Sequence, residues 1–204
     1  MVNTGPGDRR AQAAVLFGNA ITELRTTLDR LDDGHRDAVC ALAEDVVASW
    51  RQGGRFLLCG NGGSASDAQH LAAELVGRFL AERPGYAAIA LTANTSVLTA
   101  VGNDYGYARI FARQVEALGR PGDVLLVIST SGNSANCVEA VAAARAGGLK
   151  VHGFLGGDGG KLLPLVDGAL VVPSASTPKI QEIHITMGHL LCMILENWMA
   201  VRDE

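Results

Sequence analysis

This 204-residue chain has few cysteines, few aromatic residues and no long apolar run, and each of these absences excludes a class of protein. The four cysteines form no C-x-x-C pair and each lies in an apolar stretch, which predicts reduced, buried thiols. The longest uninterrupted apolar run, residues 190–195, is far shorter than the ~20 residues of a membrane span. No basic segment followed by an apolar run is visible near residue 1, so no signal peptide is expected. We therefore expect a soluble, cytoplasmic protein.

A strong charge of either sign is also missing. The chain has 17 Lys and Arg against 21 Asp and Glu, a net charge of −4, which gives no global attraction to nucleic acid or to an anionic membrane. We expect neither as a partner. Hydrophobic residues make up 48% of the chain and aromatic residues only 5%, so the core must be mostly aliphatic. Glycine, in contrast, is abundant, with 25 residues.

Five short apolar runs, each bounded by Gly, Pro, Asp or Ser, predict strands that are buried on both faces. They are residues 56–59, 87–91, 124–128, 151–155 and 169–172. Helical stretches lie between most of them, at residues 65–80, 97–118 with a break at 102–106, 134–145 and 161–166. This alternation predicts an α/β fold, with an open parallel five-stranded sheet flanked by helices.

Further helices are expected at the two ends of the chain. Residues 11–31 and 36–51 show the apolar spacing of helices, and Asp32-Asp33-Gly34 separates them, which predicts an N-terminal helical hairpin. Residues 178–199 predict a long C-terminal helix, with Pro178 suited to its first turn. No linker or low-complexity tract interrupts the chain. We expect a single domain over residues 11–204, preceded by a flexible N-terminus at residues 1–10.

Two strand-to-helix junctions, residues 57–66 (LLCGNGGSAS) and 126–135 (LVISTSGNSA), are similar to each other. In both, an apolar strand runs into Gly, Asn and Ser, and a helix begins at once. Glycine allows close approach of a ligand, and the N–H groups at a helix start attract an anion, so the pair favours phosphate binding at the carboxyl edge of the sheet. The alternative is two ordinary loops with serine N-caps.

Nucleotide binding fits these turns less well. Gly60, Gly62 and Ala65 match the dinucleotide pattern G-x-G-x-x-A, but the next strand ends in Ala-Leu-Thr-Ala, without the carboxylate that would hold a ribose. No Gly-Lys-Ser/Thr follows either turn, so neither is a Walker loop. Turns rich in hydroxyls and poor in lysine suit the phosphate ester of a small metabolite.

A set of metal-ligating side chains can be read from helical spacing. His70 and Glu74 are spaced i, i+4 on one helix, and Gln181 and His189 are spaced i, i+8 on the last one, so each pair lies on one stripe. Two His, one Glu and one amide oxygen can form a four-ligand site for zinc or another divalent ion. Packed or surface histidines are the alternative. His184, on a different stripe, is interpreted as structural or as a support for the ligands.

Five stretches in order along the chain resemble the phosphoheptose isomerase family of sugar-isomerase (SIS) domains. They are CGNGGS (59–64), DAQHLAAEL (67–75), VGND (101–104), ISTSGNS (128–134) and IQEIH (180–184). The resemblance covers nearly the whole chain from about Ala11. It implies an aldose–ketose isomerase that converts D-sedoheptulose 7-phosphate to D-glycero-D-manno-heptose 7-phosphate through an enediol(ate). It also implies one zinc ion per subunit and a homotetramer.

The resemblance further implies roles for individual residues. The metal ligands fall on His70, Glu74, Gln181 and His189, and Glu74 and His189 are also the implied acid/base pair. The implied substrate contacts, including the adjacent Ser64, are Asn61, Gly62, Gly63, Ser64, Glu74, Asn103, Asp104, Ser129, Thr130, Ser131, Ser134 and Gln181. Where the family often carries Asp and Arg, this sequence has Ser176 and Lys179. These replacements put in question any contact that the family's Asp makes, and they leave the four implied metal ligands unchanged.

Two non-enzymatic functions remain as alternatives. A relative in the same family binds a replication-initiator ATPase, but that branch lacks the glutamate and the last histidine of the metal set, and both are present here. A SIS-type sugar-phosphate sensor that controls transcription needs an added DNA-binding module, and the first 55 residues contain no basic recognition helix. These differences favour the enzyme.

Overall fold

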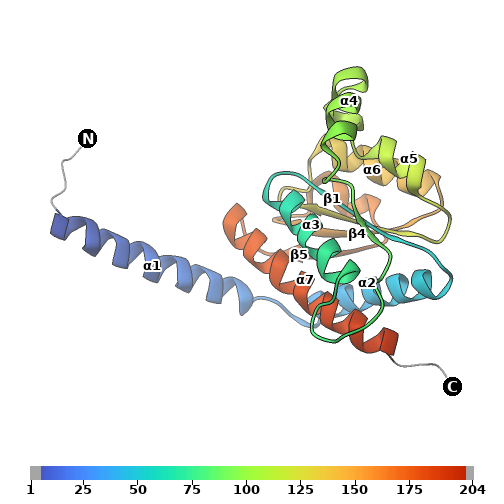
Figure 1. Cartoon of the computed structure of the whole chain (residues 1–204). Coiled ribbons are helices and arrows are strands. Elements are labelled where there is room, and N and C mark those ends of the chain that lie inside the picture. Colours follow the sequence, from blue (N-terminus) through green and yellow to red (C-terminus); the bar gives the residue numbers. More distant parts are fainter. Residues whose placement is uncertain (1–5, 201–204) are drawn as a thin grey trace.

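Five parallel strands form one open sheet in the computed structural model, which describes residues 6–200 (Figure 1). The strand order is β2-β1-β3-β4-β5. The strands are β1 (Phe56–Gly60), β2 (Ala88–Ala90), β3 (Val124–Ser129), β4 (Lys150–Gly156) and β5 (Gly168–Val172). The predicted α/β fold with five parallel strands is therefore confirmed, and each strand lies where an apolar run placed it.

Helices cover both faces of the sheet. One face is covered by α2 (Asp33–Arg51), α3 (Gly63–Val76) and α7 (Thr177–Ala200), and the other by α5 (Ala112–Leu118) and α6 (Ala135–Ala146) (Figure 1). The remaining elements are α4 (Thr95–Tyr105) and the 3-10 helices η1 (Tyr107–Arg109) and η2 (Gly160–Leu165). The break predicted inside residues 97–118 occurs at Gly106, whose φ of +84° is open to glycine and ends α4.

The side chains of the strands explain the two-sided core. Phe56 and Leu58 of β1 pack against α2, α3 and α7, while Leu57 and Cys59 pack on the opposite side, and all four are fully buried. Successive strand residues point to opposite faces, so a strand covered by helices on both sides has to be apolar at every position. This is why the strands read as uninterrupted apolar runs.

The N-terminal helices are both present, but α1 (Pro6–Leu28) begins earlier than expected. Residues 6–10, which we expected to be flexible, form its first turns, and residues 1–5 lie outside the described residues. Figure 1 shows α1 extending away from the sheet instead of folding back along α2. Its large apolar side chains Val15, Leu16 and Phe17 are 61–71% exposed. Among the described α-helices, these three side chains are the most exposed of the large apolar residues.

The scarce cysteines form no disulfide. All four are free; Cys59, Cys137 and Cys192 are buried and Cys40 is half-buried. No helix in the described part of the chain has both the length and the apolar character needed to cross a membrane.

Candidate functional site

The two glycine- and serine-rich turns lie side by side at the carboxyl edge of the sheet. Strands β1 and β3 are neighbours, with Gly60 paired to Ile128 at their ends. Strand β2, which follows β1 in the chain, pairs with one edge of β1, and β3 pairs with the opposite edge of β1. This is the topological switch point of the sheet, where open α/β sheets bind their ligands.

A pair of amide groups joins the two turns. Asn61 Nδ2 donates to Asn136 Oδ1, and Asn136 Nδ2 donates to Asn61 Oδ1, both at 2.8 Å. The hydroxyl of Tyr107 also donates to Asn61 Oδ1, at 3.2 Å. The side chain of Asn61, an implied substrate contact, thus holds the turns together, and this role was not visible in the sequence.

The first turn brings the predicted residues of α3 and α7 together. Gly62 has φ +56°, a conformation that other residues rarely adopt, and α3 starts at Gly63. A Cβ atom at position 63 would lie only 2.6 Å from Gln181 Nε2, so Gln181 packs directly against the turn. The N-terminal part of α7 is therefore next to the start of α3, as a shared site requires.

The second turn presents hydroxyl groups before α6. Ser129 Oγ and Ser134 Oγ are 3.4 Å apart, and Ser131 Oγ accepts from the backbone N–H of Asn133 at 3.2 Å. Gly132 has φ +63°, and a Cβ atom there would overlap the carbonyl group of Gly159. Ser129 is buried, whereas Ser131 is exposed, so the hydroxyls run from the sheet toward solvent. Such a turn at a helix start suits an anion.

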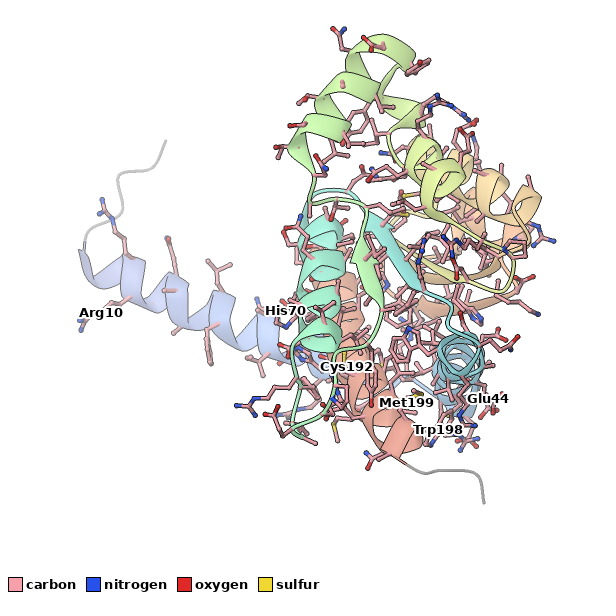
Figure 2. The ribbon with its side chains drawn as sticks, turned by 45° about the vertical axis from the view of Figure 1, so that its right-hand side comes forward. Arg10, Glu44, His70, Cys192, Trp198 and Met199 are labelled. Atoms are coloured by element: carbon pink, nitrogen blue, oxygen red, sulfur yellow. The ribbon has the colours of Figure 1, made fainter. Side chains whose placement is uncertain are left out.

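His70, Glu74 and His189 meet where α3 packs beside α7. Figure 2 shows His70 on α3, next to the helix α7 that carries Cys192. His70 Nε2 lies 2.9 Å from His189 Nε2, at hydrogen-bond distance, and 3.5 Å from Glu74 Oε1. The side chains of His70 and Glu74 are 46% and 25% exposed, so a small ligand can reach them. Three residues that the sequence placed on two separate helices are thus brought together.

Two imidazoles and a carboxylate are donor types that zinc binds in proteins. Around tetrahedral zinc with bonds of ~2.1 Å, neighbouring ligand atoms lie ~3.4 Å apart. The separation of 3.5 Å from His70 to Glu74 is close to this value, and that of 2.9 Å from His70 to His189 is shorter. Within the described part of the chain, however, no group of three or more His, Cys, Asp or Glu side chains is arranged so that it could hold a metal ion. Zinc binding therefore stays a prediction.

Asp67 is a further polar residue of this site, and the sequence reasoning gave it no role. Its Oδ2 atom is buried and has no hydrogen-bond partner among the described residues. Burial raises the pKa of Asp67, and the nearby His70 and His189 lower it in part. The spacing i, i+3 from Asp67 to His70 was the available signal. An unpaired buried carboxylate oxygen beside two imidazoles adds to the fit for a cation.

Two other predicted contacts lie apart from this group. Asn103 and Asp104 are exposed on α4, where Asn103 Nδ2 donates to Asp104 Oδ1 at 2.8 Å. Within residues 6–200, no side-chain hydrogen bond or ion pair joins them to the turns or to the histidines. Lys179, which stands where the family often has Arg, is 8% exposed and its Nζ lies 2.8 Å from both carboxylate oxygens of Glu182.

Comparison with known proteins agrees with this architecture. The model of the SIS domain family matches residues 21–156. A phosphoheptose isomerase of Roseiflexus sp. is 55% identical over 86% of this chain and 91% of its own length. The structure of a phosphoheptose isomerase from Francisella tularensis has 40% identity and a TM-score of 0.84, covering 93% of this chain and 98% of that one. One from Neisseria gonorrhoeae has 42% identity and a TM-score of 0.81, covering 92% and 98%. The chain belongs to the phosphoheptose isomerase family of SIS-domain enzymes.

Proposed function

We propose that this protein is an aldose–ketose isomerase that converts D-sedoheptulose 7-phosphate to D-glycero-D-manno-heptose 7-phosphate. The observation that carries the proposal is the meeting of His70, Glu74 and His189 from two helices beside a glycine turn against which Gln181 packs. The relatives named phosphoheptose isomerase, at 55% and 58% identity, support it. The SIS fold alone does not distinguish an enzyme from a binding protein, so the proposal depends on this site.

The reaction needs two proton transfers between neighbouring carbons. A base takes a proton from C1 of the ketose, and the electrons of that bond form the C1=C2 double bond while the C2 oxygen becomes an enolate or enol. A proton then adds to C2, the C1 hydroxyl gives up its proton to become the aldehyde, and the C2 oxygen takes up a proton to become a hydroxyl group, so no proton is gained or lost overall. Glu74 and His189 supply two proton carriers on different helices, which suits transfers at two adjacent carbons.

We further propose that His70, Glu74, Gln181 and His189 hold one zinc ion in each subunit. When bound, the ion would polarise the substrate oxygens and stabilise the negative charge of the enediolate. Gln181, packed against Gly63, brings an amide oxygen next to the turn. Glu74 is the one charged ligand among neutral donors.

The two turns hold the far end of the substrate. Ser129, Thr130, Ser131 and Ser134 offer hydroxyl donors to the phosphate, and the start of α6 offers backbone N–H groups. Residues Asn61 to Ser64 of the first turn line the space between the bound phosphate and α3. Binding the phosphate at a fixed distance from Glu74 and His189 orients C1 and C2 before the proton transfers.

We propose in addition that the enzyme is a homo-oligomer, a tetramer of dihedral symmetry. On α7, Leu191 and Leu195 are buried in the core, whereas Leu190 and Met193 are 38% and 41% exposed. The exposed apolar surface lies chiefly on α1, where Leu16 and Phe17 are 69% and 71% exposed. A monomer rarely leaves such a helix face in water, so a second copy of the chain is its proposed cover.

The test is turnover of the purified protein on sedoheptulose 7-phosphate, with and without added zinc. We expect the aldose phosphate to appear, and Glu74→Gln to form it about 100-fold more slowly or worse. Glu82→Gln, a change at a carboxylate with 89% exposure beyond the end of α3, should retain the wild-type rate. No aldose phosphate from the zinc-supplemented wild type would contradict the proposal. Tight sugar-phosphate binding without turnover would favour the sensor alternative.

A further inference from the structure

The loop between α3 and β2, residues 77–87, is fastened to α7 by one buried carboxylate. Glu196 is 7% exposed and accepts four hydrogen bonds. Its Oε1 accepts from the backbone N–H of Phe79 at 3.0 Å and from Arg83 Nε at 3.0 Å, and its Oε2 accepts from the N–H groups of Leu80 and Ala81 at 3.1 and 3.2 Å. A carboxylate buried this far requires such complete pairing. The path of the loop is therefore set by α7.

Arg83 joins the same carboxylate to the end of α3. Its side chain is 8% exposed, and its guanidinium donates to the backbone carbonyl oxygens of Glu74 and Leu75, both at 2.9 Å. These carbonyls belong to the last turn of α3, where the helix itself supplies no further N–H groups to bond them. Its guanidinium carbon also lies 4.1 Å from the ring centroid of Tyr86. The ion pair of Arg83 and Glu196 thus connects α3 to α7, the two helices that carry Glu74 and His189.

Phe79 is the residue that this loop delivers to the site. Its ring stacks on the imidazole of His189, with centroids 5.6 Å apart and an interplanar angle of 23°. His189 meets His70 through Nε2, at 2.9 Å, with the two rings at 70° to each other. The face of His189 is therefore covered by Phe79 while its Nε2 points to His70. This fixes the rotation of the imidazole about its own axis as well as its position.

We propose that Phe79 is a positioning residue for His189, and that Glu196 holds Phe79 in place. This inference rests on the proposed function, in which His189 transfers a proton and ligates zinc. Phe79 itself touches no reacting atom. A misplacement of about 1 Å at a reacting group can lower a rate about 100-fold, so the stacked ring acts on kcat and leaves phosphate binding to the turns.

The test compares Phe79→Leu with Phe79→Tyr, which keeps the stacking ring. The control is Leu80→Ala on the same loop, where the side chain is 66% exposed. For Phe79→Leu we expect kcat to fall about 10-fold with KM changed less than about twofold, and for Phe79→Tyr and Leu80→Ala we expect kcat within about twofold of the wild type. A kcat of wild-type size in Phe79→Leu, an equal loss in Phe79→Tyr, or a loss confined to KM would overturn the proposal.

A second variant tests the role of Glu196. Glu196→Gln replaces one acceptor oxygen by a donor, so it frees part of the loop without touching the ring of Phe79. If Glu196 acts through Phe79, the fold-loss of kcat in the double variant of Phe79→Leu and Glu196→Gln is smaller than the product of the two single fold-losses. A fold-loss equal to that product would overturn the role of Glu196. Crystal structures separate the proposal from the proposed function. His189 should leave its wild-type rotamer in Phe79→Leu and keep it in Phe79→Tyr even if no turnover is found, and an unmoved His189 in Phe79→Leu refutes the positioning role.

Discussion

Acidification should destabilise this protein through His184, a histidine of α7 that lies in the core. His184 is 1% exposed; its Nε2 donates to the carbonyl oxygen of Leu155 at 2.9 Å, and its Nδ1 has no partner among the described residues. The ring of Phe154 lies 5.8 Å away. Burial lowers the pKa of His184 to about 4, and the bond to Leu155 opposes this only in part. These contacts agree with a structural role for this histidine.

The sign and size of the effect follow from this pKa. In the unfolded chain His184 titrates near 6.5, so between pH 6.5 and about 4 the unfolded state binds more protons than the folded state. The stability that neutral His184 supplies is complete above pH 6.5 and is lost as the pH falls toward 4. At pH 5 the loss amounts to about 2 kcal/mol of unfolding free energy.

Urea unfolding at fixed protein concentration measures this loss. We compare the wild type with His184→Gln, which keeps an N–H donor but does not titrate, at about pH 7.5 and about pH 5. The variant is expected to be less stable at both values, but the wild type should lose about 2 kcal/mol more than the variant between them. Equal losses in the two proteins would show that His184 does not couple folding to pH.

Three further outcomes are expected. Ser131→Ala removes a hydrogen bond to the substrate phosphate worth about 1.5–3 kcal/mol, so KM in steady-state assays should rise about tenfold or more; equal turnover of the phosphorylated and free sugar would refute the phosphate assignment. Phe17→Glu should convert the oligomer into smaller species by light scattering, and a wild-type monomer at micromolar concentration would contradict the assembly. Burial raises the pKa of Glu196, but the N–H groups of residues 79–81 and Arg83 lower it more, to a net value below 4.5. The stability from its charge is lost as the pH falls below 4.5, so the thermal unfolding temperatures of wild type and Glu196→Gln should converge there; a constant difference would contradict this.

The sheet could be predicted closely because its signal is local. A strand covered on both faces is apolar at each position and is bounded by turn residues, so β1 and β3 were located to within a residue at either end. The end of α3 could not be predicted in this way, because it depends on residues that are distant in the sequence. The apolar pattern runs on to Leu80, but the helix ends at Val76. There Arg83 donates hydrogen bonds to the last carbonyl oxygens of the helix, and Glu196 accepts hydrogen bonds from the N–H groups that follow.

The site was predictable in part for the same reason. Helical spacing places His70 with Glu74 and Gln181 with His189, because each pair is a local pattern. That the two helices meet, so that His70 and His189 approach to 2.9 Å, follows from packing that no spacing reveals, and only the family resemblance implied it. The contact of Phe79 with His189 depends on a loop path set by Glu196, and no local pattern encodes it.

The most direct test of the catalytic assignment is solvent deuterium exchange into C1 of the heptulose phosphate, followed in wild type and in Glu74→Gln. The exchange reports proton transfer before the product is released. Glutamine keeps the size of the side chain and one oxygen donor but removes the titratable group. We expect exchange to slow about 100-fold or more while the substrate still binds, because general acid–base catalysis typically contributes ~10²–10⁴-fold. Exchange by Glu74→Gln at close to the wild-type rate would contradict it, and His189 would then have to carry both proton transfers.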